Sequence, residues 1–148
     1  MRRTTAGVVR QPPRRQLLLA SATVVYLLVR VALSAMPFGW FRRGVDGVGP
    51  LPPAVRPSWT PSEIGWAVGG VATALPGTGT CLPAALTAYL LLRETGHDAE
   101  VRVGVTPGGR SVHAHSWVVH DGAALVGDEP RLDRYESLGV VLPREEPP

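Results

Sequence analysis

The first hydrophobic stretch of the chain is a largely apolar, uncharged run over residues 17–29. Apolar residues continue at helical spacing until a proline ends them, which predicts a helix over about 14–36. Thr23, Arg30 and Ser34 fall near one stripe of this helix, so we expect it to be mostly buried, against the core or a partner. A membrane-surface helix, a true span and a signal peptide are the alternatives. The apolar run of 13 residues is shorter than the roughly 20 that a span requires, and Arg30 would lie near the middle of a longer one.

Two later stretches also have helical spacing. Thr60 can cap the first, Pro61 suits its first position, and an acidic residue follows in the first turn, which predicts a helix over 62–74. The second stretch, 80–96, begins with Thr-Cys-Leu-Pro and is closed by Gly96. The buried stripe expected for this helix consists of Leu82, Ala85, Leu86, Tyr89 and Leu90.

After the third helix the apolar period changes from helical spacing to alternation. Valines alternate with other residues over 101–105, which predicts a strand. Two more strands are expected over 112–120 and 123–128, joined by an Asp-Gly pair that is a strong hairpin signal. Helices followed by an antiparallel β-meander make the expected fold class α+β.

Composition divides the chain into four expected segments. A flexible basic tail occupies 1–13 and an apolar helix, with its arginine-flanked end, occupies 14–43. A linker rich in proline and glycine follows over 44–61, and the main domain covers 62–148.

Charge is distributed unevenly along the chain. The first 43 residues contain eight arginines and no acidic residue, whereas the remainder contains seven arginines and twelve acidic residues. A nucleic-acid-binding body would carry a basic face, so this distribution argues against one. The single cysteine excludes an intramolecular disulfide framework and any multi-cysteine zinc or iron–sulfur site.

That cysteine, Cys81, stands in the first turn of the third helix. Free backbone N–H groups and the positive end of the helix dipole stabilise a thiolate at such a position, which makes Cys81 a candidate nucleophile. The structural alternative is a small buried hydrophobic residue, as most free cysteines are.

The hairpin offers a partner for the thiol. His113, His115 and Trp117 share one face of their strand by alternation. A two-residue turn at 121–122 sets a register in which His115 faces Asp128, close enough for an imidazole and a carboxylate to hydrogen-bond. A general base needs such an orienting carboxylate. The alternative is an ordinary polar cross-strand pair.

These residues carry a resemblance to a known family. The segments GTCLPAALTAYLLLRETGHDAEVRVGV, AHSWVVHDG and VGD resemble the transglutaminase-like cysteine peptidases of lasso-peptide biosynthesis, over roughly residues 64–129. The resemblance implies a transglutaminase-like (papain-like) peptidase core within 62–148. It also implies a Cys-His-Asp triad of Cys81 as nucleophile, His115 as base and Asp128 as orienting acid.

The resemblance also implies a function, which is cleavage of the leader from a ribosomally made precursor before macrocyclisation. The expected stand-alone endopeptidase needs no cofactor or metal. Its expected partners are the precursor peptide, a separate leader-recognition protein and an ATP-dependent macrocyclase, with no nucleic acid. A cytoplasmic location is expected, with peripheral membrane association as the lesser option. His113 and Trp117 are expected to line the substrate cleft, although Trp117 also suits simple packing and His113 is the alternative to His115 as the base. Asp121 or Glu129 are the fallbacks for the acid.

Three other functions stay open at this point. Another transglutaminase-fold amide hydrolase or acyltransferase would use the same triad. A catalytically inactive membrane-associated scaffold would depend on the apolar helix and not on the thiol. A metal-binding module would use Cys81, His113, His115 and Asp128 as ligands.

Overall fold

Helices precede strands in the structure, a computed structural model that describes residues 12–47, 49–75, 77, 81–105, 114–126 and 135–142. In order along the chain, the described elements are α2 (Pro13–Ala35), α3 (Phe38–Gly47), the 3-10 helix η1 (Pro53–Val55), α4 (Pro61–Ala74), α5 (Cys81–Glu94), β1 (Glu100–Val105), β2 (Ala114–His120), β3 (Ala123–Val126) and β4 (Glu136–Leu142). This order confirms the α+β class.

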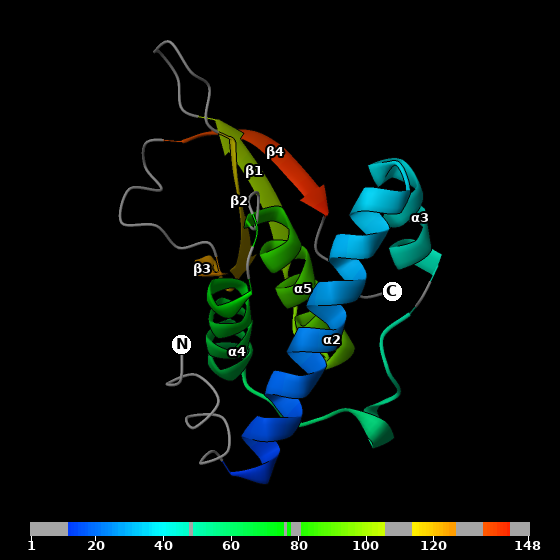
Figure 1. Ribbon diagram of the computed structural model, residues 1–148, viewed down its shortest axis with the longest axis vertical. Coiled ribbons are helices and arrows are strands. Elements are labelled where there is room, and N and C mark those ends of the chain that lie inside the picture. Colours follow the sequence, from blue (N-terminus) through cyan, green and yellow to red (C-terminus); the bar gives the residue numbers. More distant parts are fainter. Residues whose placement is uncertain are drawn as a thin grey trace.

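The four strands form one antiparallel sheet in the order β3-β2-β1-β4. The sequence did not predict β4, and its position means that the sheet is not a simple meander: β4 pairs with β1, at the opposite edge from β3 (Figure 1). The sequence of β4 lacks the alternation of apolar and polar residues that marks a strand, because its exposed positions include the apolar residues Leu138 and Val140. Gly139 between them has a φ of 130°, which interrupts the regular strand geometry. The β1–β4 pairing accordingly contains two register shifts.

The hairpin between β2 and β3 has the expected two-residue turn. Asp121 and Gly122 both have positive φ, at 49° and 78°, which matches the twist of the flanking strands. The first two pairs beyond the turn keep the expected register, but an irregularity shifts it by one residue at the pair Val118↔Val126. The uninterrupted register on which the sequence argument relied is therefore not kept beyond the second pair.

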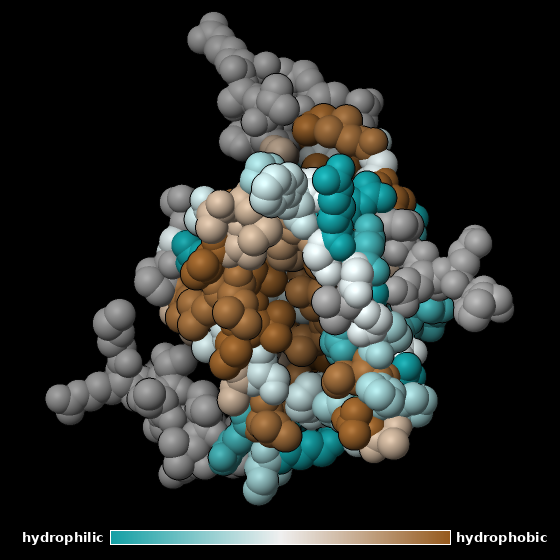
Figure 2. Space-filling model, turned by 90° about the vertical axis from the view of Figure 1, so that its right-hand side faces the viewer, coloured by the Kyte–Doolittle hydropathy of each residue, from teal (hydrophilic) through white to brown (hydrophobic). Residues whose placement is uncertain are grey.

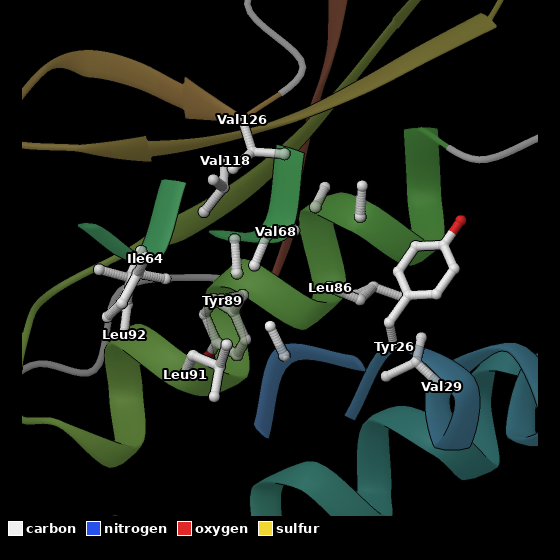
Figure 3. Close-up of a cluster of buried hydrophobic side chains, with 14 of the residues drawn as sticks. Tyr26, Val29, Ile64, Val68, Leu86, Tyr89, Leu91, Leu92, Val118 and Val126 are labelled. Carbon is white, nitrogen blue, oxygen red and sulfur yellow. The ribbon is translucent and has the colours of Figure 1, made fainter. Parts of the chain in front are cut away.

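Helix α5 occupies the centre of the molecule. Helices α2 and α4 pack against it on one side and the sheet packs on the other (Figure 1). Of the expected stripe, Ala85, Leu86 and Tyr89 are buried, whereas Leu82 and Leu90 are only half-buried. Because α5 is covered on several sides, it also buries residues outside the stripe, namely Ala84, Ala88, Leu91 and Leu92. In Figure 3, Val118 and Val126 of the sheet and Ile64 and Val68 of α4 lie around Tyr89 and Leu92 of α5. The helix ends as expected at Gly96, which has a φ of 81°.

The helix expected over about 14–36 is confirmed as α2, but the segment expected over 14–43 also contains a second helix, which was not predicted. Helix α2 ends at Ala35, before Pro37, and α3 begins at Phe38. The expectation that α2 is mostly buried is wrong, because α4 and α5 cover only one of its faces and the opposite apolar face is exposed. The residues of the covered face are Leu18, Ala22, Tyr26 and Val29.

The expected linker over 44–61 also contributes to the core. It contains the end of α3 and buries Val45 and Trp59. The Arg93 side chain of α5 donates a hydrogen bond to the carbonyl of Val45 at 2.5 Å, which ties the end of α5 to α3. The proline and glycine content suggested a linker, and the sequence contains little to contradict it. Helix α3 is short, and its two buried side chains, Phe41 and Val45, lie only one turn apart, so they give no sustained helical period.

The start of α4 is held by a capping box. The Glu63 backbone N–H donates to the Thr60 hydroxyl, and the Thr60 N–H donates back to the Glu63 carboxylate at 2.9 Å. Arg14 of α2 forms an ion pair with Glu63 at 2.5 Å. The Thr60 N–H and then the Arg14 guanidinium lower the pKa of Glu63. The sequence-predicted cap is confirmed, and it also connects α2 to α4.

Candidate active site

Cys81 is the first residue of the central helix, and its side chain is half-buried. The 14 residues of α5 span about 21 Å. The chain then turns back, and the six residues of β1 return over about 20 Å. Because β2 runs antiparallel to β1, it begins at the end of the sheet where α5 also begins (Figure 1). The topology thus brings the start of α5 and the start of β2 to the same end of the molecule.

His115 is the second residue of β2 and lies in an aromatic cluster. Its ring stacks on Trp117 with ring centroids 6.1 Å apart and an angle of 22° between the planes. Tyr135, which directly precedes β4, contacts His115 at 5.2 Å and Trp117 at 6.5 Å between centroids. No local sequence pattern relates Tyr135 to β2, so its place beside His115 was not predicted.

Alternation determines which face of the strand His115 occupies. Val118 belongs to the core cluster and is paired with Val101, which is equally buried. His115 and Trp117 therefore lie on the other face of β2. Among the described residues no hydrogen bond joins the Cys81 thiol to the His115 ring. Proton transfer between them requires direct contact or one bridging water.

Trp117 is only 9% exposed, and its ring stacks on His115 and is tilted against Tyr135. Its partner across the ladder is Arg102 of β1. This burial favours the packing role over a cleft wall. The other residue expected in the cleft, His113, lies outside the described residues.

The expected acid, Asp128, and one fallback, Glu129, also lie outside the described residues. The other fallback, Asp121, is in the hairpin turn at the far end of β2 from His115. Its side chain is 80% exposed and lies 3.2 Å from the His120 ring. Asp121 is therefore not placed to orient His115.

The remaining two histidines form a separate group at that far end. The ring of His97 lies 3.0 Å from the Trp59 carbonyl, and the ring of His120 lies 2.5 Å from the Asp98 carbonyl. The two rings meet edge to face, 5.8 Å apart. These contacts join the end of α5 to the sheet, which is a structural role.

No group of three His, Cys, Asp or Glu side chains among the described residues could hold a metal ion. Of the four ligands in the metal-binding alternative, only Cys81 and His115 fall within that part of the chain. The described residues thus offer no support for the metal-binding alternative.

A sequence model of the transglutaminase-like superfamily matches residues 23–140. The chain belongs to the transglutaminase-like superfamily. The match runs from α2 to β4, so it includes Cys81, the β2 strand and part of the N-terminal helix. This superfamily includes cysteine peptidases and acyltransferases, and the transglutaminase-like fold is generally a cysteine-protease-like catalytic fold. No curated protein and no solved structure matches the chain.

Proposed function

We propose that this transglutaminase-like protein is a cysteine endopeptidase that removes the leader from a lasso-peptide precursor before macrocyclisation. The observation that carries the proposal is the position of Cys81 in the first turn of the central helix, at the end of the molecule where β2 and His115 begin. Alternation places the His115 ring on the face of β2 away from Val118, so the pairing of His115 with Cys81 is the step that the experiments below test. Superfamily membership supports cysteine-based acyl transfer. The choice of substrate rests on the resemblance of the Cys81 and His115 segments to the leader peptidases.

The proposed reaction is acyl transfer to water. His115 accepts the proton of the Cys81 thiol, and the sulfur attacks the carbonyl carbon at the leader–core junction. The backbone N–H of Cys81 stabilises the oxyanion of the tetrahedral intermediate. The C–N bond then breaks, and protonated His115 donates its proton to the departing amine of the core peptide. Water hydrolyses the thioester, which releases the leader as a carboxylic acid and restores the thiol. Asp128 is the proposed orienting acid.

The proposal includes partners and a location. The enzyme acts with a separate leader-recognition protein and supplies the free amine of the core peptide to an ATP-dependent macrocyclase. Both the precursor and ATP are cytoplasmic, so the proposed location is the cytoplasm, including its membrane surface.

The test is cleavage of a cognate precursor, with its leader-recognition protein present, by the wild type and by Cys81→Ala and His115→Ala. We expect Cys81→Ala to abolish cleavage and His115→Ala to lower kcat by at least about a hundredfold. His120→Ala is the matched control, because it removes an imidazole from the opposite end of the same strand. Far-ultraviolet circular dichroism establishes that each variant is folded at the assay temperature. Residual cleavage by Cys81→Ala would overturn the proposed nucleophile.

A second measurement needs no substrate. Cys81 is the only cysteine, so alkylation by iodoacetamide reports on one thiol. If His115 assists that thiol, His115→Ala will slow alkylation at neutral pH by about tenfold or more, and His120→Ala will leave it unchanged. Equal rates in all three proteins would refute the His115 assignment.

Superfamily membership equally supports transfer to an acceptor other than water. Adding hydroxylamine to the cleavage reaction distinguishes the two outcomes. A hydrolase yields mainly the free leader acid at low hydroxylamine, whereas an acyltransferase yields mainly the hydroxamate.

A further inference from the structure

Helix α2 exposes a continuous apolar face. On the helical projection a set of large apolar residues lies opposite the buried face that packs on α4 and α5. This set, here called the outer stripe, consists of Leu17, Val24, Leu27, Leu28 and Val31, which are 46–65% exposed. Figure 2 shows apolar atoms gathered in one area on the side of the molecule that α2 and α3 form. Soluble monomers rarely leave a contiguous apolar area of this kind uncovered.

Cationic residues flank the outer stripe along the chain. Arg42 and Arg43 stand on α3, just beyond the end of α2, and both are exposed. Arg14 and Arg15 at the start of α2 are also exposed but turn toward α4: Arg14 pairs with Glu63, and the Arg15 guanidinium lies over the Trp66 ring, 5.2 Å from its centroid. Trp40, which is 67% exposed, lies between the stripe and Arg42 along the chain. An apolar stripe with arginines and a tryptophan at its margin is the composition of helices that lie in the interface of anionic membranes.

Helix α2 is long and apolar enough to cross a membrane by length and composition, and it is one such helix among the described residues. Its other face argues against a span. Leu18, Ala22 and Tyr26 are fully buried against α4 and α5, and a span would strip them from the core. It would also carry Arg30 into the hydrocarbon. A helix lying flat on the surface keeps the core intact and covers only the outer stripe.

We propose that the outer stripe docks the protein peripherally on an anionic phospholipid surface, with α2 parallel to the bilayer. A second copy of the chain fits this face less well. Paired in parallel, two copies of α2 would bring Arg42 and Arg43 of one chain against the same pair of the other. Paired antiparallel, they would meet Arg14 and Arg15, whose charge Glu63 offsets only in part. Anionic headgroups complement the Arg42–Arg43 end directly. This proposal does not depend on the proposed peptidase activity.

The test is sedimentation of the full-length chain with vesicles of phosphatidylcholine, with or without phosphatidylglycerol, at low and high salt. We expect binding to the anionic vesicles, weakened about tenfold or more by high salt or by omission of phosphatidylglycerol. Leu28→Glu/Val31→Glu should weaken it about tenfold or more, because charge replaces two exposed apolar contacts. The matched control is Leu138→Glu/Val140→Glu, which alters similarly exposed residues on β4.

Four results would overturn the proposal. The first is that the wild type remains in solution with every vesicle, and the second is that the two double variants lose binding equally. The third is that the bound protein resists extraction at alkaline pH, as a spanning protein does. The fourth is a wild-type dimer, by light scattering, that Leu28→Glu/Val31→Glu converts to a monomer without vesicle binding in either form. Cleavage of a soluble precursor by the same variant keeps this outcome separate from failure of the peptidase proposal.

Discussion

Tyr135 is the residue beside His115 that local sequence patterns could not identify. Its ring contacts both His115 and Trp117, so three rings from two separate parts of the chain hold one another. An aromatic contact contributes about 0.5–1.5 kcal/mol beyond the area it buries. In the proposed peptidase, this contact would fix the orientation of the His115 imidazole, which makes Tyr135 a positioning residue.

We therefore expect Tyr135→Ala to lower kcat for precursor cleavage by about two- to tenfold, with KM little changed. Tyr135→Phe keeps the ring and should retain wild-type kcat. Steady-state kinetics of both variants provide the check. If Tyr135→Phe is as impaired as Tyr135→Ala, the ring contact is not what positions His115.

The limits of sequence reasoning at this scale follow from locality. Cys81 could be singled out because a helix start is a local feature, and His115 because strand alternation is one. The contact with Tyr135 depends on how the chain returns to form β4, across a sheet edge that the sequence did not predict. The facing of His115 and Asp128 was argued from a regular hairpin, and the register shift at Val118 removes that premise. That pairing stays a prediction.

Elements with strong local signals were predicted well. Helix α4 has its cap, proline and acidic first turn in the expected places, and the hairpin turn has its expected Asp-Gly pair. Elements without such signals were missed. Helix α3 is short and glycine-containing, and β4 is interrupted by Gly139, so neither has a regular period. Strand β4 is stabilised by pairing with β1, and α3 packs on α2 and is tied to α5 by the hydrogen bond from Arg93 to the Val45 carbonyl.

The capping box of α4 makes a prediction about acid stability. The Thr60 N–H and the Arg14 guanidinium stabilise ionised Glu63 in the folded state, so its pKa is lower there than in the unfolded chain. The resulting stability is fully present above the ordinary glutamate pKa of about 4.3 and is lost as pH falls through the lowered folded value. Glu63→Gln removes this contribution.

Urea unfolding of the wild type and Glu63→Gln across the acid range tests this effect. The wild type should be the more stable protein near neutral pH, and the difference between the two free energies of unfolding should shrink as pH falls below the ordinary glutamate value. A difference that stays constant down to the most acid pH would show that the ionised carboxylate contributes nothing.

At the scale of the whole molecule, α2 is the element whose two faces have different surroundings. The superfamily match begins inside this helix, and its buried face shares the core with α4, α5 and the sheet. The sequence analysis assigned it to a segment separate from the main domain. Periodicity could not correct this, because a helix that is apolar nearly all round gives no sign of which face is covered.

Two leucines of α2 test this division between core and outer stripe. Leu18 is fully buried against the core, whereas Leu28 is 63% exposed on the outer stripe. Leu18→Ala leaves a cavity and should lower the free energy of unfolding in solution by about 2–5 kcal/mol. Leu28→Ala should change it by less than about 0.5 kcal/mol, because no cavity forms at an exposed site. Urea denaturation without lipid gives both values. Similar losses for the two variants would mean that the outer stripe is covered in solution, by a second copy of the chain or by part of the chain itself, and would leave no free face for a membrane.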